Sequence, residues 1–450
     1  MTNPLLRTRP IPPIRMVHLG LGNFYRAHQA WYTQHASDAA EWGYAAFEGR
    51  TMGTAAALRS QDNVYTIAFT APDGDHFERI ESIAASYTAE DVDEWVALCA
   101  APTTAIISTT VTEAGYCADG AGGVNTGDPV VAADIEALRA GSITVLSTPA
   151  RIVAGLAARR AAGAGPVALM SCDNLLENGT VLRQVTRATA ALVDPDLVAW
   201  IDANVSFVTT MVDRITPRPT DDDLARVEAG LGVHDATPII TEPFGEWVID
   251  GTFPAGRPDW ASAGATFTSD IESNERRKLW LLNGSHSLLA YTGMVRGRET
   301  VADAMADPVC RATAQAWWDL AIGVLGGDAE HLRAYTEALA ARFDNPRIRH
   351  LLAQIGTDGS LKIPVRWIPA LTTLREQGVL PAPVITGLAA FTLHVHGGSV
   401  LDAARDALLA ARGTDVHATL RGVLGVIAPA LLADAELLAA IDAALEHFPA

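Results

Sequence analysis

The sequence predicts two domains of different class, an α/β domain followed by a mostly α-helical domain. Short apolar strands that end in glycine or polar turns alternate with helical segments up to about residue 265. From residue 266 onward, alanine- and leucine-rich segments with helical spacing replace them. The chain has 450 residues, which is too long for one ordinary core. We therefore expect domains at 1–265 and 266–450, with substrate bound in a cleft between them.

The first predicted strand, residues 16–19, runs into a glycine turn and then a helix from about residue 24. In dinucleotide-binding domains such a turn lets the backbone approach the pyrophosphate, and the helix N-terminus receives its charge. Here the third glycine of the common G-x-G-x-x-G pattern is replaced. The pattern predicts a Rossmann-like dinucleotide-binding domain, with cofactor contacts at Gly20, Gly22, Asn23, Phe24 and Arg26.

A second strand ends at Glu48, about where an acidic residue binds the ribose hydroxyls of NAD. Arg50 follows closely and could instead face a 2′-phosphate. NAD is therefore the favoured cofactor, and NADP is not excluded.

Two further apolar strands break into polar turns, one at residues 109–113 and the other after residues 167–170. Because the carboxyl ends of parallel strands line the cofactor cleft, these turns are expected at the site. The first turn supplies three more predicted cofactor-binding residues, Thr109, Val111 and Thr112.

The C-terminal domain is predicted from five segments with helical spacing. Turns that contain glycine, or asparagine with proline, separate them. The segments are residues 303–322, 328–343, 384–396, 402–412 and 430–446.

The composition restricts the partners and the cellular location. A formal net charge of −19 argues against nucleic acid and anionic membranes, which select basic surfaces, and favours a small-molecule substrate. The four cysteines are far apart and form no CxxC pair, which is typical of reduced thiols in the cytoplasm. The first residues lack the apolar run of a signal peptide, and no apolar stretch has the length of a membrane span. We expect a cytoplasmic protein.

Lysine is rare in this chain: only Lys278 and Lys362 occur among 33 basic residues counted as Lys plus Arg. Unlike arginine, lysine can lose its proton when its pKa is depressed, so a retained lysine is a candidate base. On an α-helix, Lys278, Asn283 and His286 would fall within an arc of about 140° at ~100° per residue. Glu275 would lie one turn earlier on the same side, and the many leucines predict a buried segment.

The chain resembles the polyol-specific long-chain dehydrogenases, the mannitol dehydrogenase family, over nearly its whole length. The resemblance rests first on K-x4-N-x2-H at 278–286, V-D-R-I-x-P at 212–217 and S-C-D-N-x-x-x-N-G at 171–179. It also rests on G-x-G-x-F-x-R-A-H at 20–28, on TEPFGEWVIDGTFPAGRPDW at 241–260 and on DGSLKIP at 358–364.

This resemblance implies a zinc-independent hydride transfer between NAD(H) and a secondary alcohol or its ketone. Lys278 would be the general base in oxidation and the acid in reduction. Asn174 and Asn283 would stabilise the developing alkoxide, and His286 would orient a substrate hydroxyl. Glu275 and Asp213 would pass protons or tune the base, Lys362 matches a second, substrate-binding lysine, and Arg366 is a further candidate cation.

Three other classes of protein fit the sequence less well. A zinc enzyme would need a ligand set that no cysteine or histidine cluster completes, so no metal is expected. A short-chain dehydrogenase would need Tyr-x3-Lys, and neither lysine has a tyrosine four residues before it. A non-catalytic dinucleotide sensor is a more distant alternative, against which the intact Lys278, Asn283 and His286 set argues.

The resemblance leaves the substrate open. A keto-uronate reductase of the D-fructuronate to D-mannonate type is slightly favoured, and a mannitol 2-dehydrogenase or another polyol dehydrogenase is the alternative. The uronate reaction needs a cation for the carboxylate, which Lys362, Arg366 or Arg214 could supply. A monomer or a weak homo-oligomer is expected, because no heptad run suggests a larger assembly.

Overall fold

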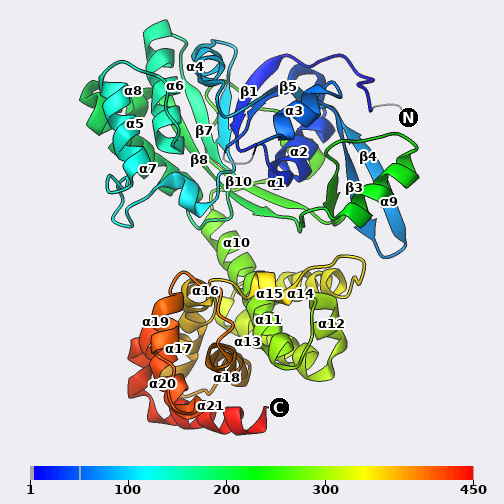
Figure 1. The fold of residues 1–450 in the computed structure, drawn as a ribbon, viewed down its shortest axis with the longest axis vertical. Coiled ribbons are helices and arrows are strands. Elements are labelled where there is room, and N and C mark those ends of the chain that lie inside the picture. The colour runs from blue at the N-terminus through cyan, green and yellow to red at the C-terminus, as the bar shows by residue number, and fades with distance from the viewer. Residues whose placement is uncertain (1–4, 50–51, 449–450) are drawn as a thin grey trace. The chain divides into compact units, whose positions relative to one another are not determined.

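The computed structural model of this chain describes residues 5–49 and 52–448. The protein consists of two compact units, Met1–Glu272 and Ser273–Ala450. The first unit contains the strands and the second is built of helices (Figure 1). The predicted fold class, an α/β domain followed by a mostly helical domain, is confirmed. The boundary between the units lies slightly later than the predicted one.

The N-terminal unit is built on a large twisted sheet. Within the described residues this sheet has eight strands in the order β11-β10-β8-β7-β6-β1-β2-β5. The strands from β8 to β5 are mutually parallel, and β10 runs antiparallel to β8. The strands are β1 (Ile14–Leu19), β2 (Gly43–Phe47), β5 (Ile83–Tyr87), β6 (Ile106–Thr109), β7 (Val167–Ser171), β8 (Val205–Asp213), β10 (Glu246–Asp250) and β11 (Thr266–Phe267).

Successive side chains of a strand point to opposite faces of the sheet, and in this sheet both faces are buried. Met16 of β1 packs in one hydrophobic cluster and its neighbour Val17 packs in another. The first cluster includes side chains of helices α1 (Asn23–Ala27) and α2 (Gln29–His35) and of a small sheet with the order β4-β3-β9. The small sheet contains β3 (Tyr65–Ala71), β4 (Gly74–Ile80) and β9 (Ile239–Thr241).

The opposite face is covered by helices α4, α6, α7 and α8, which contribute to the second cluster. In Figure 1 helices α5 to α8 gather at one side of the strands. This layering is the reason the strands read as apolar runs without alternation. The helices are α3 (Thr54–Arg59), α4 (Val92–Ala100), α5 (Pro129–Arg139), α6 (Thr148–Ala162), α7 (Asn178–Val193), α8 (Pro195–Asn204) and α9 (Asp221–Leu231).

The strand order reverses between β1 and β6. From β1 the chain passes to β2 and β5 on one side, and then returns to β6, β7 and β8 on the other side. In open α/β sheets, ligands bind beyond the carboxyl ends of the strands at such a reversal. The turns after β1 and β6 are therefore the expected cofactor position.

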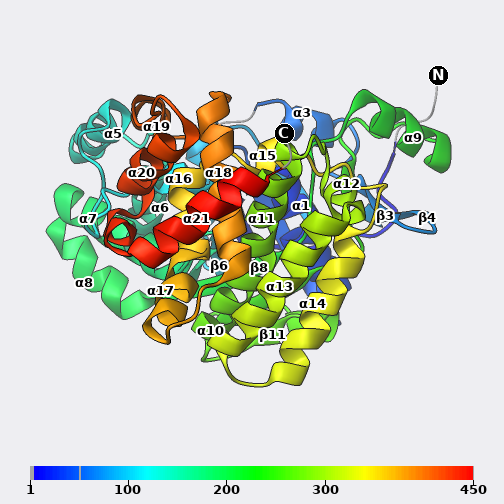
Figure 2. The same cartoon turned by 90° about the horizontal axis from the view of Figure 1, so that it is seen from below.

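The C-terminal unit is arranged around α11 (Ser285–Val295), which packs against α12, α13, α15 and α18. In Figure 2 the red helix α21 lies beside the orange α18, and the two are in contact. The remaining bounds are α10 (Ile271–Arg277), η4 (Lys278–Gly284), α12 (Val301–Ala306), α13 (Pro308–Leu325), α14 (Ala329–Phe343), α15 (Leu352–Ile355), α16 (Gly359–Arg366), α17 (Ile368–Glu376), α18 (Ala382–Gly397), α19 (Arg405–Ala410), α20 (Val416–Ile427) and α21 (Ala435–His447).

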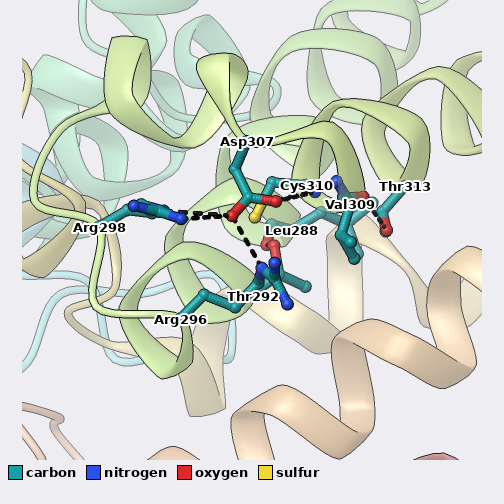
Figure 3. A network of polar contacts seen from close by, with 8 residues as sticks. All are labelled: Leu288, Thr292, Arg296, Arg298, Asp307, Val309, Cys310 and Thr313. Carbon is teal, nitrogen blue, oxygen red and sulfur yellow. Dashed lines mark hydrogen bonds and ion pairs between the residues drawn. The ribbon is translucent and has the colours of Figure 1, made fainter. Parts of the chain in front are cut away.

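The predicted helix at 303–322 is in fact two helices, which meet at Asp307. The Asp307 carboxylate caps α13, since Oδ1 accepts hydrogen bonds from the backbone N–H of Val309 (2.9 Å) and Cys310 (3.3 Å). Its Oδ2 accepts from Arg296 (2.9 Å) and from Arg298 (2.9 Å), as Figure 3 shows. Burial raises the pKa of this carboxyl, but the hydrogen bonds from the two arginines and from the two backbone N–H groups together outweigh burial and hold the pKa at about 2.

Two other predicted helices are shorter than expected. The segment 402–412 is helical only over α19, and the helix expected at 430–446 begins at α21, where the Asp434 side chain accepts from the N–H of Leu437. A capping residue sets the start of α21, a detail that hydrophobic spacing does not show. No helix in the described part of the chain is long and apolar enough to span a membrane. The four cysteines form no disulfide with one another.

Candidate active site

The turn after β1 brings the backbone against the end of β6. Gly20 has φ +114°, and a Cβ added there would lie 2.1 Å from the Thr110 carbonyl oxygen. The N–H groups of Gly20 and Leu21 both donate to the Phe47 carbonyl at 2.9 Å, which ties the turn to the end of β2. Glycine is therefore required at Gly20 by both conformation and space. This close approach fits the tight turn that a dinucleotide pyrophosphate needs.

A buried histidine, which the sequence analysis missed, stabilises this turn. His18 Nδ1 lies 2.8 Å from Ser108 Oγ, and its Nε2 lies 2.9 Å from Thr110 Oγ1. Burial lowers the pKa of His18 to about 3, although a hydrogen bond to the Gly20 carbonyl opposes the shift. A neutral imidazole thus connects β1 to β6 directly below the glycine turn. The sequence does contain a signal for this residue, because a histidine within an otherwise apolar strand indicates a buried polar group that needs partners.

The other predicted residues of this turn contact their own domain. Arg26 donates to Asn23 Oδ1 (2.8 Å) and to the Thr237 carbonyl (2.6 Å). Burial lowers the pKa of Arg26 to about 10. Phe24 stacks on His28 with ring centroids 5.1 Å apart. Cofactor contacts by these three predicted residues stay a prediction.

Glu48 directly follows β2, and its Oε1 accepts a hydrogen bond from the N–H of Ala55 at 2.8 Å. This bond fixes the carboxylate beside the first turn of α3. The position fits an acidic residue that binds the adenosine ribose. Arg50, the residue that left NADP open, lies outside the described residues.

One carboxylate holds the turn after β6. Asp173 accepts hydrogen bonds from the N–H groups of Val111 (3.1 Å) and Thr112 (2.6 Å) and from the Tyr116 hydroxyl (2.6 Å). Thr112 has φ +69°, an unfavourable conformation for a β-branched residue, so these bonds stabilise a strained turn. Burial raises the pKa of Asp173 in spite of them. Thr109, the remaining predicted residue of this turn, contacts the Tyr116 hydroxyl through Oγ1 at 3.1 Å.

Asn174 follows Asp173 and is exposed, in a turn that a second asparagine holds in place. The Asn178 amide donates to the Asp173 carbonyl (2.8 Å) and to the Thr210 carbonyl (2.7 Å), and it accepts from the Thr210 N–H (3.0 Å). Asp213 lies at the end of β8 and is 5% exposed. The sequence analysis missed Asp173, Tyr116 and Asn178 as supporting residues, although two of them stand in the S-C-D-N-x-x-x-N-G stretch.

The segment that carries Lys278 is a π-helix, η4, and not the α-helix that was predicted. In a π-helix the hydrogen bond joins residues five apart. Lys278 and Asn283 are five residues apart, so they lie one π-turn from each other on one side of the helix. On an α-helix these two side chains would be about 140° apart at ~100° per residue. Such insertions in helices occur frequently at functional sites.

Side chains from elsewhere in the C-terminal unit bind five consecutive carbonyls of this region. The indole N–H groups of Trp317, Trp318 and Trp367 donate to the carbonyls of residues 280, 281 and 284 at 2.8, 2.8 and 3.0 Å. Ser285 Oγ donates to the carbonyls of residues 281 and 282, and Arg366 donates to that of residue 283. These donors compensate for the poorer backbone geometry of the π-helix and explain why it is stable here.

His286, at the start of α11, is 6% exposed and stacks on Phe343 with ring centroids 4.5 Å apart. Burial lowers the pKa of His286 well below its ordinary value. The nearby basic groups of His350, Arg342, Arg366 and Lys278 lower it further. The imidazole is therefore neutral at pH 7, and it lies close enough to Lys278 to sense its charge.

The remaining predicted residues of the C-terminal unit are Glu275, Lys362 and Arg366. Glu275 is 6% exposed on α10, close in sequence to Lys278. The Lys362 ammonium donates to the carbonyls of Thr357 (2.6 Å) and Ile355 (3.2 Å), at the C-terminal end of α15. Substrate binding by Lys362 stays a prediction, as do the roles of the other predicted site residues. In the described part of the chain, no three Asp, Glu, His or Cys side chains are grouped as a metal site requires.

Comparison with known proteins identifies the family. Residues 14–262 match the mannitol dehydrogenase Rossmann domain, and residues 270–421 match the mannitol dehydrogenase C-terminal domain. The chain belongs to the mannitol dehydrogenase family. The resemblance inferred from the sequence motifs is confirmed, and with it the prediction of an oxidoreductase that acts on polyols or sugar acids.

Relatives that are named for different substrates are similar to this chain to about the same degree. D-mannonate oxidoreductase of Escherichia coli K12 is 36% identical over 96% of this chain and 93% of its own length. D-arabinitol 4-dehydrogenase of Ralstonia nicotianae is 37% identical over 90% of this chain and 89% of its own length. Mannitol 2-dehydrogenase of Pseudomonas fluorescens, solved with NAD and D-mannitol, has a TM-score of 0.84 at 31% identity and covers 99% of this chain and 93% of its own. NAD, the cofactor predicted here, is the one bound in that structure.

Proposed function

We propose that this protein is an NAD-dependent reductase of a keto-uronate, of the D-fructuronate to D-mannonate type, which also catalyses the reverse oxidation. The observation that carries the proposal is the π-helix, which sets Lys278 and Asn283 on one side of a buried segment. Similarity to D-mannonate oxidoreductase over nearly the full length of both chains supports the substrate class.

NAD fits the N-terminal unit. The Gly20 turn leaves no room for a side chain, as a pyrophosphate-binding turn requires, and the Glu48 carboxylate is fixed at the end of β2. Bound NADH supplies the hydride to the carbonyl carbon of the substrate. Gly20, Gly22 and the turn at 109–112 would hold the cofactor, and Glu48 would bind its ribose hydroxyls.

The protein supplies the proton and the stabilisation of charge. In reduction, the Lys278 ammonium donates its proton to the carbonyl oxygen, so that the ketone becomes a secondary alcohol and the lysine becomes a neutral amine. The amides of Asn174 and Asn283 donate hydrogen bonds to the same oxygen as negative charge develops on it. Neutral amides stabilise the alkoxide without preventing its protonation. Glu275 and Asp213 exchange the proton with solvent, and His286 binds a substrate hydroxyl.

The test is oxidation of NADH, followed by its near-ultraviolet absorbance, with D-fructuronate, D-tagaturonate and D-fructose offered in parallel. We expect the keto-uronates to be preferred, with NADH used in preference to NADPH. Lys278→Ala should lose at least about 100-fold in kcat, the lower end of what a positioned acid or base contributes, and keep its affinity for NADH. The matched control is Arg349→Gln, since Arg349 is exposed and pairs with Glu299.

Preference for D-fructose would instead identify a mannitol 2-dehydrogenase, the activity named for the similar Pseudomonas fluorescens structure. Full activity in the Lys278→Ala variant would refute the proposed acid. NADH binding without turnover of any ketose would favour a dinucleotide sensor. We further propose a cytoplasmic location, which the wide spacing of the four cysteines in the sequence supports, and a monomeric or weakly associated state, which fits a sequence without a heptad run.

A further inference from the structure

Two buried imidazole nitrogens near the proposed substrate site have no hydrogen-bond partner. They are His286 Nε2 and His350 Nδ1, on rings whose centroids lie 5.1 Å apart at an interplanar angle of 84°. His286 is 6% exposed, so its nitrogen is withdrawn from bulk water. A buried polar atom without a hydrogen bond destabilises the folded protein. Two such atoms side by side indicate a position where a ligand supplies the missing hydrogen bonds.

The surroundings of these rings are basic. Burial and, to a smaller extent, the positive charge of Arg342 together lower the pKa of His350 to about 4. Arg342 also lowers the pKa of His286, together with Lys278 and Arg366. Both imidazoles are therefore neutral at pH 7, and each can direct an N–H at an acceptor. Arg342 adds a positive charge that acts on both rings, a combination that selects an anionic acceptor.

His350 and Arg342 come from one stretch of chain, and the charge of Arg342 acts on the His350 ring. Arg342 is in the last turn of α14, next to Phe343, whose ring stacks on His286. His350 lies on the loop that leads from α14 into α15, and its carbonyl accepts a hydrogen bond from the Val301 N–H at 3.0 Å. The loop is thus anchored to the start of α12, and the His350 ring packs edge-on against the His286 ring.

The three cations considered from the sequence are each held by other groups. Lys362 donates to the carbonyls of residues 355 and 357, and Arg366 donates to Ser287 Oγ (2.8 Å) and to the carbonyl of residue 283. Arg214, in the N-terminal unit, donates to the carbonyls of residues 27 and 244 and lies over the Trp31 ring at 4.5 Å. These contacts give each of the three cations a structural role within its own unit.

We propose that His350 and Arg342 bind the carboxylate of a sugar-acid substrate whose neighbouring hydroxyl contacts His286. This inference rests on the proposed keto-uronate activity and names the residues that select the acid over the neutral sugar. A guanidinium and a carboxylate form charge-assisted hydrogen bonds, and the His350 N–H provides a second donor. Specificity follows because an uncharged hydroxymethyl group in the same place leaves these donors poorly paired.

The experiment compares two substrates in one variant. In His350→Ala, we expect kcat/KM for the preferred keto-uronate to fall about 10- to 100-fold, as expected for a lost hydrogen bond to a charged group. The value for D-fructose, or the inhibition constant of D-mannitol if D-fructose is not turned over, should change less than about threefold. Arg349→Gln, which removes an exposed positive charge one residue away, should change neither value.

Several outcomes would overturn the inference. An equal loss for the acid and the neutral sugar would mean that His350 acts on the reaction or the fold and not on the carboxylate. Unchanged keto-uronate kinetics would exclude His350 from the site. His350→Asn, which keeps a side-chain donor, guards against misfolding and should retain part of the preference for the acid. The wild-type substrate profile tests the proposed function separately, because a wild type that prefers keto-uronates upholds that function whatever the variants show.

Discussion

Replacing Trp317 by phenylalanine tests whether the indole donors stabilise the π-helix that carries Lys278. The Trp317 N–H donates to the Trp280 carbonyl at 2.8 Å in a fully buried position. Loss of the bond costs about 0.5–1.5 kcal/mol, and a carbonyl left unsatisfied raises the cost to about 1–3 kcal/mol. The indole edge also contacts Gly284, where an added Cβ would lie 2.9 Å from the nitrogen, so the smaller ring leaves a void.

A matched control is the neighbouring substitution Trp318→Phe. The Trp318 N–H donates to the Leu281 carbonyl at 2.8 Å, but that carbonyl also accepts from Ser285 Oγ at 2.5 Å. It therefore keeps a donor after the substitution, and the expected cost is smaller.

Steady-state kinetics with NADH and the preferred ketose should distinguish the two variants. A change of about 1.4 kcal/mol in the free energy of the π-helical conformation corresponds to a tenfold change in the equilibrium between this conformation and other conformations of the segment. We expect kcat of Trp317→Phe to be roughly tenfold lower than that of Trp318→Phe, with unchanged NADH affinity, since the cofactor turns belong to the other unit. Equal kcat values, or a larger loss in Trp318→Phe, would refute the argument that the indole donors hold the π-helix.

Two further substitutions test the turn after β1 and the junction of α12 with α13. Gly20→Ala should weaken NADH binding at least about tenfold in a fluorescence titration, because the Cβ would meet the Thr110 carbonyl and φ is positive; near-normal affinity would contradict this reading. Asp307→Asn should lower the free energy of unfolding, measured in urea at pH 7, by about 2 kcal/mol, because the hydrogen bonds to Asp307 in the folded state hold the pKa of its carboxyl at about 2. Because the native pKa is depressed, this stability is present above about pH 4 and is lost as the pH falls towards 2, so the gap between variant and wild type should narrow there. If the difference in stability between wild type and Asp307→Asn stayed constant over this pH range, the negative charge of Asp307 would not contribute to stability.

Local signals in the sequence were sufficient for the glycine turn and for the first parallel strands. Gly20 and the apolar runs at β1, β6 and β7 depend on backbone conformation and burial, which short stretches encode directly. The start of a new helix after Asp307 could have been predicted from the sequence, since an aspartate before a proline is a typical helix start. It was missed because hydrophobic spacing continues across it.

The supporting residues of the site could not be found in the same way. Hydrogen bonds join His18 to Ser108 and Asp173 to Thr112 over long sequence separations, and no pattern in one sequence reveals such pairs. The π-helix was also hidden, because the apolar residues of η4 fit an α-helical period and the donors that favour it come from distant tryptophans. His350 stands in a loop, where burial cannot be inferred from periodicity.

The small number and the burial of the lysines affect how the protein reacts with amine-labelling reagents. Side-chain amines occur at only two positions, of which Lys278 is 7% exposed and Lys362 is held by carbonyl oxygens. An amine-acylating reagent thus meets one buried lysine, Lys278, and one half-buried lysine, Lys362, whose ammonium donates to carbonyl oxygens. The rate at which Lys278 is acylated becomes a direct record of how often its helix opens to solvent.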